Sequence, residues 1–240
     1  MEELKSDKKA AVESMFNSIA RRYDFLNHFL SFGIDRIWRK KAIKMISASA
    51  RNPLILDVAT GTADLALTAL RINPEKIIGI DISEKMIEIG RKKIIRKGLS
   101  DKIELRTGDS ENIGFSDCTF DVAMVAFGVR NFSDPLKGLS EMRRVIRPGG
   151  SIMVLEFSKP VAFPFRQIYS FYFLNILPFL GRLFSKDRKA YRYLPDSVMQ
   201  FPDNENFIKI LNAAGFINSK QKRLSGGVAS IYTGIKPSMQ

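Results

Sequence analysis

Short apolar runs alternate with amphipathic stretches along most of the chain. Runs of strand length cover residues 53–58, 76–81, 102–106, 120–126 and 150–156, with a last strand over 225–235. Apolar residues at helical spacing predict helices over residues 62–72, 83–97, 134–146 and 203–214. Pro148-Gly149-Gly150 predicts a turn immediately before the strand that follows it. This alternation predicts an α/β fold, a doubly wound and mostly parallel sheet with helices on both faces.

Two further segments fall outside the alternation. Residues from about 8 to 48 carry apolar positions such as Val12 and Phe16 at helical spacing, so we expect an N-terminal helical cap. Residues from about 159 to 200 are expected to form an inserted helical lid. We therefore expect one domain over residues 1–240 that consists of the sheet, the cap and the lid.

Composition narrows the class of protein. With 240 residues, 45% of them hydrophobic and 26% charged, the chain is long and apolar enough for one globular α/β domain. A single cysteine, Cys118, excludes a disulfide framework and indicates a reducing compartment; we expect it to have no catalytic role. The charged start contains no apolar signal core, so we expect a cytoplasmic protein.

The net charge of +13 predicts an anionic partner, either a nucleic acid or a membrane surface. The lid segment concentrates this charge, since Asp187 is its one acid among seven bases from Lys159 to Arg192. Its many aromatic and aliphatic residues favour an anionic membrane surface or an apolar substrate over nucleic acid. Arg166 and Arg182 leave too short an uncharged stretch for a membrane span. The alternative is a helical lid that packs on its own domain.

Acidic residues follow three of the predicted strands. Asp57 and Asp81 end the first two, and Asp109-Ser110 comes just after the third. The carboxyl ends of parallel strands are where nucleotide-like ligands bind in such sheets. The turn after Asp57 contains one glycine, Gly61, so it matches neither the dinucleotide fingerprint nor a phosphate-binding P-loop.

These residues suit a ligand that carries an amine, a ribose and an adenine. Asp57 can accept from an ammonium, Asp81 from both ribose hydroxyls and Asp109 from the exocyclic adenine amine. Thr62 can cap the following helix or contact a carboxylate at the helix N-terminus. Each acid alone is more often a turn or cap residue, but the three together indicate S-adenosylmethionine.

Longer motifs give the chain a specific resemblance. They are residues 23–31 (YDFLNHFLS) with 35–38 (DRIW), 127–132 (FGVRNF), 144–158 (RVIRPGGSIMVLEFS), and 193–197 (YLPDS) with 201–202 (FP). With these motifs the chain resembles the class I S-adenosylmethionine-dependent methyltransferases. More narrowly, it is similar to the ubiquinone/menaquinone biosynthesis C-methyltransferase family over nearly its whole length.

The resemblance implies methylation of a ring carbon on a polyprenylated quinol precursor. The main expectation is conversion of demethylmenaquinol to menaquinol; the alternative is a 2-methoxy-6-polyprenyl-1,4-benzoquinol of the ubiquinone route, or both. More distant alternatives are a methyltransferase for RNA or a soluble small molecule, and a lipid-binding or assembly protein that keeps the fold without catalysis. Carried over by motif, the cofactor contacts are Thr62, Asp81, Asp109 and Ser110, to which the loop argument adds Asp57 and Gly61.

The chain departs from the family pattern at several positions. Ala63 stands where glycine is usual, and alanine is small enough for the loop to survive. Asp35 replaces a usual histidine, so a histidine there cannot be an indispensable base. Ala126 replaces a frequent serine and removes its hydroxyl from the site.

Methyl transfer to carbon needs in-line positioning and loss of a neighbouring phenol proton. A guanidinium stays protonated, so Arg130 is expected to stabilise a phenolate or to orient the water that takes the proton. We expect Asn131 beside it and Tyr23 across the ring; an ion pair with a nearby acid is the alternative for Arg130. No metal is expected, no nucleic acid partner is expected, and membrane contact, if it occurs, should be peripheral.

Overall fold

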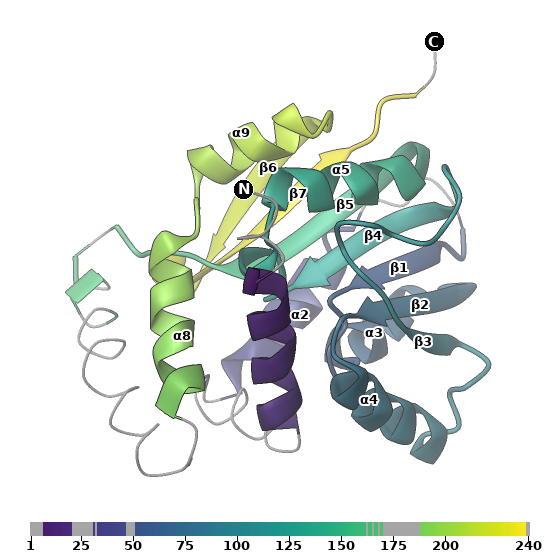
Figure 1. Cartoon of the computed structure of the whole chain (residues 1–240). Coiled ribbons are helices and arrows are strands. Elements are labelled where there is room, and N and C mark those ends of the chain that lie inside the picture. The colour runs from purple at the N-terminus through teal and green to yellow at the C-terminus, as the bar shows by residue number, and fades with distance from the viewer. Residues whose placement is uncertain are drawn as a thin grey trace.

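A computed structural model describes residues 7–20, 31, 33–46, 51–161, 163–164, 166–167, 169 and 188–238 of the chain. In this part the strands form one sheet in the order β3-β2-β1-β4-β5-β7-β6 (Figure 1). The strands are β1 (Leu54–Val58), β2 (Lys76–Asp81), β3 (Ile103–Thr107), β4 (Phe120–Ala126), β5 (Ile146–Phe157), β6 (Ile217–Leu224) and β7 (Ala229–Ile235). β1 to β5 are parallel, and β7 is antiparallel to both of its neighbours, β5 and β6. The predicted mostly parallel sheet is confirmed.

The order in which successive strands are added to the sheet switches sides at β1. β2 and β3 add on one side of β1, and β4 and β5 on the other, so that Asp57 of β1 pairs with Gly79 of β2 and Met124 of β4. The carboxyl ends of these neighbouring strands therefore meet at one edge, where a doubly wound sheet leaves a crevice for a ligand.

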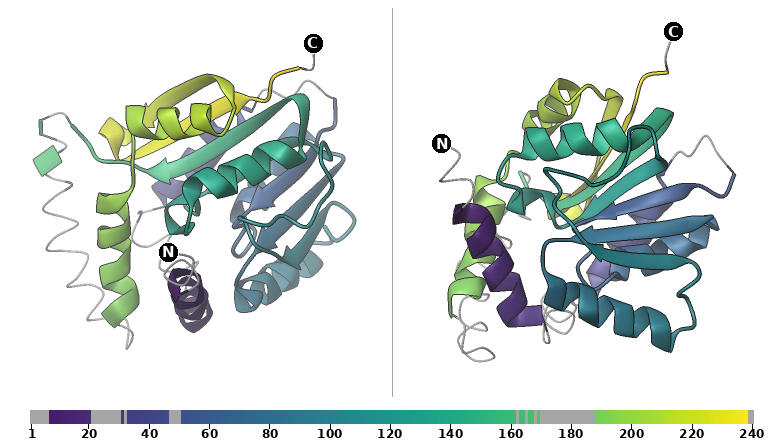
Figure 2. Two further views of the ribbon diagram at one scale, coloured as in Figure 1. Left: turned by 45° about the horizontal axis from the view of Figure 1, so that its top comes forward. Right: turned by 45° about the vertical axis from the view of Figure 1, so that its right-hand side comes forward.

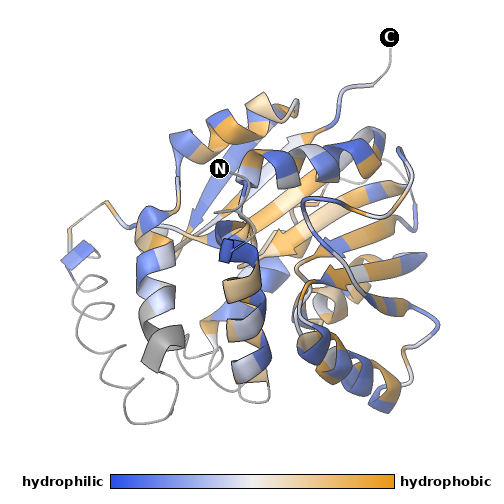
Figure 3. Cartoon of the chain, in the orientation of Figure 1, coloured by the Kyte–Doolittle hydropathy of each residue, from blue (hydrophilic) through white to orange (hydrophobic). Residues whose placement is uncertain are grey.

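Helices pack on both faces of the sheet (Figure 2). α5 (Pro135–Val145) and α9 (Glu205–Ala213) cover one face, where Phe207 and Tyr232 are fully buried. α2 (Ile34–Ile43), α3 (Asp64–Ala69) and α4 (Glu84–Arg96) cover the other, where Trp38 joins the buried core. Hydrophobic residues dominate the central strands between these layers, as Figure 3 shows.

Two more helices lie near the carboxyl ends of the strands. The first spans residues 7–20, and α8 (Arg188–Gln200) belongs to the predicted lid segment (Figure 1). The N-terminal region predicted as helical from 8 to 48 thus contains at least two separate helices, since a turn at residues 31 and 33 precedes α2. Most of the predicted lid lies outside the described residues.

Two local predictions were wrong, and one strand was missed. β6 was missed because its sequence, INSKQKRL, is charged and largely exposed, as befits an edge strand with one neighbour. Pro148-Gly149-Gly150 does not precede β5 but lies within it, where the register against β4 shifts. A Cβ at Gly150 would come 2.6 Å from the Asp121 carbonyl oxygen, so the backbones approach too closely there for a side chain. β7 begins at Ala229, after a 3-10 turn at Ser225–Gly227.

Candidate active site

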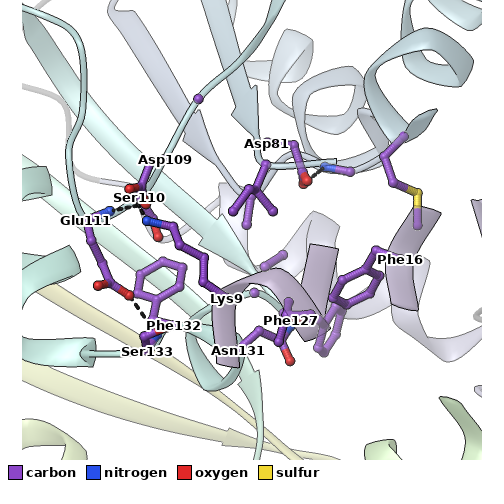
Figure 4. A pocket seen from close by; sticks show the side chains of 18 residues that line it. Lys9, Phe16, Asp81, Asp109, Ser110, Glu111, Phe127, Asn131, Phe132 and Ser133 are labelled. Atoms are coloured by element: carbon purple, nitrogen blue, oxygen red, sulfur yellow. Dashed lines mark hydrogen bonds and ion pairs between the residues drawn. The ribbon is translucent and has the colours of Figure 1, made fainter. Parts of the chain in front are cut away.

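A pocket opens at the carboxyl ends of β1, β2 and β4 and is covered by the helix of residues 7–20 (Figure 4). Five of the residues predicted from sequence line it: Gly61, Asp81, Asp109, Ser110 and Asn131. Asp81 ends β2 and the others lie in the loops after β1, β3 and β4, and the parallel register of the sheet brings these four strand ends together.

Asp81 ends β2 and is held in place by the backbone around it. One carboxylate oxygen accepts from the Gly61 N–H at 2.8 Å and the other from the Ser83 N–H at 2.9 Å. Burial raises the pKa of Asp81, and these backbone hydrogen bonds oppose that rise because they favour the ionised form. The same contacts fix the glycine loop against the end of β2.

Asp109, in the loop after β3, also orders its surroundings. Its Oδ1 accepts from the Glu111 N–H at 2.9 Å, and its Oδ2 pairs with the Lys9 ammonium of the covering helix (Figure 4). Glu111 in turn accepts from the Ser133 N–H at 2.6 Å and from the Asp134 N–H at 3.0 Å. This chain of contacts ties the loop after β3 to the loop after β4.

Asp57, at the end of β1, is fully buried. Its Oδ2 accepts from the Thr60 hydroxyl at 2.7 Å, whereas its Oδ1 has no hydrogen-bond partner. Burial raises the pKa of Asp57 to about 7. The Thr60 hydroxyl, the Ala66 backbone N–H and the Arg39 charge oppose the rise, and the Asp81 charge adds to it. A buried carboxylate oxygen without a donor is costly, and a ligand ammonium would satisfy it.

The turn between β1 and α3 is built without a side-chain cap. Ala63 occupies the N-cap position of α3 with a φ of 70°, a left-handed conformation that glycine adopts more easily. Of the two roles expected for Thr62, capping the helix was wrong, and its hydroxyl accepts from the Lys93 ammonium at 3.0 Å. Its contact with a ligand carboxylate stays a prediction. Thr62 and Asp57 line a second, smaller cavity beside the main pocket.

Arg130 is not among the residues that line the pocket. Its guanidinium donates to Glu156 at 2.7 Å and to the Phe127 carbonyl, and it lies 5.5 Å from the centroid of the Phe157 ring. The Arg130 side chain is 6% exposed and that of Glu156 is 0% exposed, so this is a buried ion pair. The structure thus contains the ion pair that was the alternative to a catalytic role for Arg130.

The neighbouring Asn131 does face the pocket. Its Oδ1 accepts from the Tyr193 hydroxyl of α8 at 3.0 Å, which links the pocket to the lid segment. Burial raises the pKa of Tyr193, so this hydroxyl keeps its proton. Tyr23, the third predicted catalytic residue, lies outside the described residues.

The sequence did not identify every residue of the site. Lys9, Val12 and Phe16 reach the pocket from the first helix, and Arg39 lines the smaller cavity from α2. The helical spacing of Val12 and Phe16 indicated a buried face, but no local pattern distinguishes Lys9 or Arg39 from the many other cations.

The residues present fit S-adenosylmethionine. Carboxylates at the ends of β1 and β2 and after β3 line two neighbouring cavities, and a ligand ammonium would satisfy the unpartnered oxygen of Asp57. Across the described residues, no three His, Cys, Asp or Glu side chains group as metal ligands do.

Comparison with known proteins agrees with this geometry. The model of the ubiE/COQ5 methyltransferase family matches residues 1–236. The chain is 46% identical to a ubiquinone/menaquinone biosynthesis C-methyltransferase of Geotalea daltonii, over 96% of this chain and 98% of that protein. It is 45% identical to a demethylmenaquinone methyltransferase of Bacteroides fragilis, over 95% and 94% of the two chains.

Solved structures support the fold independently. An S-adenosylmethionine-dependent methyltransferase of Thermotoga maritima superposes with a TM-score of 0.66, at 20% identity, over 94% of this chain and 99% of that one. At that identity the likeness shows the class I methyltransferase fold and not the substrate. The family model and the relatives go further, because they match nearly every residue: the chain belongs to the ubiE/COQ5 methyltransferase family.

Proposed function

We propose that this enzyme transfers a methyl group from S-adenosylmethionine to a ring carbon of a polyprenylated quinol, mainly converting demethylmenaquinol to menaquinol. The observation that carries the proposal is the match to a demethylmenaquinone methyltransferase over 95% of the chain. The benzoquinol of the ubiquinone route is the second candidate, because other relatives are named for both pathways.

The cofactor end of the reaction uses the acids at the strand ends. Asp81 receives the ribose hydroxyls, Asp109 with Ser110 receives the adenine, and Asp57 receives the ammonium. When bound, S-adenosylmethionine supplies an electrophilic methyl group. Lys9 pairs with Asp109, so the adenine amine shares this carboxylate with the Lys9 ammonium or displaces it.

The acceptor end uses the loop after β4. Asn131 lies in the pocket wall and can hydrogen-bond to a ring oxygen of the quinol, while the Tyr193 hydroxyl fixes its amide. Arg130 positions this loop through the Phe127 carbonyl and Glu156. Its further role, stabilising a phenolate beside the reacting carbon, stays a prediction, as does the place of Tyr23 across the ring.

A peripheral contact with an anionic membrane surface would bring the enzyme to its prenylated substrate. α2 exposes Ile34 and Ile37, and its acid, Asp35, is buried. Four exposed cations share this helix and the residue after it: Arg36, Lys40, Lys41 and Lys44. Apolar residues among cations are typical of interfacial helices. None of the helices described is long and apolar enough to cross a bilayer.

The first test offers S-adenosylmethionine and two reduced acceptors, a demethylnaphthoquinol and a methoxybenzoquinol, each with a short prenyl tail. We expect methylation of the naphthoquinol, detected as label transferred from S-adenosylmethionine into a solvent-extractable lipid. Methylation of both acceptors would indicate a dual-pathway enzyme. If the protein binds the cofactor but methylates neither, the quinol proposal is wrong.

Sedimentation with vesicles tests the membrane contact. We expect the protein to sediment with vesicles that contain anionic lipid but not with neutral ones, and to be released by ~0.5 M salt, which screens surface charge. The double variant Ile34→Ser/Ile37→Ser should bind several-fold more weakly. Equal binding to both kinds of vesicle, or to neither, would contradict the proposal.

Variants of the Arg130–Glu156 ion pair distinguish a structural role of Arg130 from a catalytic one. Arg130→Met should lower the free energy of unfolding by about 3–5 kcal/mol, because it strands a buried carboxylate. Arg130→Met/Glu156→Gln removes both charges and should recover much of that loss, as urea unfolding will measure. If Arg130 also stabilises a phenolate, the double variant should still lose about 10²-fold in kcat. Full activity in a stable double variant would leave Arg130 a purely structural residue.

Cofactor affinity should depend on pH through Asp57. Its pKa of about 7 in the free protein means that it is increasingly protonated below that pH, and a neutral carboxyl receives an ammonium poorly. The Kd for S-adenosylmethionine should therefore rise as the pH falls from 7.5 to 5.5, by at most about tenfold per pH unit. Calorimetry on Asp57→Asn should give weaker binding that varies little over this range. A wild-type Kd that is constant with pH would exclude this role.

A further inference from the structure

A small cavity lies beside the main pocket at the turn between β1 and α3. It is lined by Arg39, Asp57, Ala59, Thr60, Gly61, Thr62, Asp64, Leu65 and Ala126. Ala59, Gly61 and Ala126 line both spaces, so the two adjoin along the loop. A ligand whose nucleoside fills the main pocket can therefore extend its remaining end into the small cavity.

Groups of opposite charge line this cavity. Asp57 is fully buried and presents an oxygen without a hydrogen-bond partner. Arg39 is 6% exposed, and its guanidinium carbon lies 5.5 Å from the centroid of the Phe127 ring. An α-amino acid carries an ammonium and a carboxylate on one carbon, so an acid and a guanidinium lining one small space match both of its charges.

Arg39 is held in position but keeps donors for a ligand. Its Nη1 donates to Asp35, and Asp35 also accepts from the Ser31 hydroxyl at 2.7 Å. Within the described residues, Asp35 is the single hydrogen-bond acceptor of Arg39, although a guanidinium has five N–H donors. Asp35 thus orients the guanidinium and uses part of its donor capacity.

Lys93, a second cation near this cavity among the described residues, does not compete for the same role. Lys93 donates to Thr62 at 3.0 Å and to Asp64 at 2.8 Å, and it does not line the cavity. Arg39 is therefore the cation placed to meet an anionic group that enters beside Asp57.

We propose that Arg39 binds the carboxylate of the methionyl part of S-adenosylmethionine while Asp57 binds its ammonium, with Asp35 as the positioning residue. This subsite deepens the proposed function and rests on its cofactor. It anchors the end of the cofactor opposite the adenine, so that the sulfonium between the two anchors is fixed relative to the quinol pocket.

Three ligands that differ only at the amino-acid end test this subsite by calorimetry. They are S-adenosylhomocysteine, its decarboxylated analogue S-adenosyl-3-thiopropylamine, and 5′-methylthioadenosine, which lacks both charged groups. Arg39→Met should weaken S-adenosylhomocysteine about tenfold to a hundredfold, the effect of one lost charge-assisted contact. The affinities for the other two ligands should change by less than about twofold, because neither carries a carboxylate.

Two control variants guard against a general loss of structure. Arg36→Met removes a positive charge from the exposed side of the same helix and should leave all three affinities unchanged. Asp35→Asn/Arg39→Gln removes the cation without stranding a buried acid, and it should reproduce the selective loss of Arg39→Met. Thermal unfolding of each variant checks that it is folded.

The outcomes are distinct from those of the proposed function. Equal weakening of all three ligands in the folded double variant, or no weakening of any, would overturn the role of Arg39. If the wild-type protein binds none of the ligands, the cofactor itself is wrong and the proposed function fails with it.

Discussion

The parallel pairing of β1 with β2 on one side and β4 on the other is the constraint on which the site depends. It sets Asp57 level with Gly79 and Met124 and ends three strands at one edge. The strands there pack too closely for a side chain at Gly79, because a Cβ would come 2.6 Å from the Leu105 side chain and 2.8 Å from the Thr60 hydroxyl. Loops that are remote in sequence can share one pocket because this register holds their strands together.

Much of the fold and several site residues could be predicted from sequence because their signals are local. A buried strand is recognised as an apolar run, and an acid at or just after its end is read directly from the sequence. Because parallel strands end at the same edge of a sheet, the sequence alone places Asp57, Asp81 and Asp109 at that edge. Departures from the family pattern also have physical accounts. Ala63 takes the left-handed conformation that suits glycine, and Asp35 orients Arg39.

The rest depended on contacts between distant segments, which no local pattern contains. Lys9 meets a carboxylate 100 residues away, and Arg130 finds its partner on β5. A guanidinium beside a strand end is compatible with a catalytic role and with an ion pair, and only the position of Glu156 distinguishes them. β6 was missed for a related reason, since an edge strand with solvent on its free side can be as polar as a loop.

That polar edge has a consequence for how the molecule meets its own copies. β6 exposes Lys220, Lys222 and Arg223 along one border of the sheet. At the opposite border, β3 carries Glu104, paired with Lys76 at 2.6 Å and with Arg106 at 2.5 Å. A second chain that approached either border to continue the sheet would have to strip water from these charges. These charges thereby disfavour growth of the sheet by strand addition at either border.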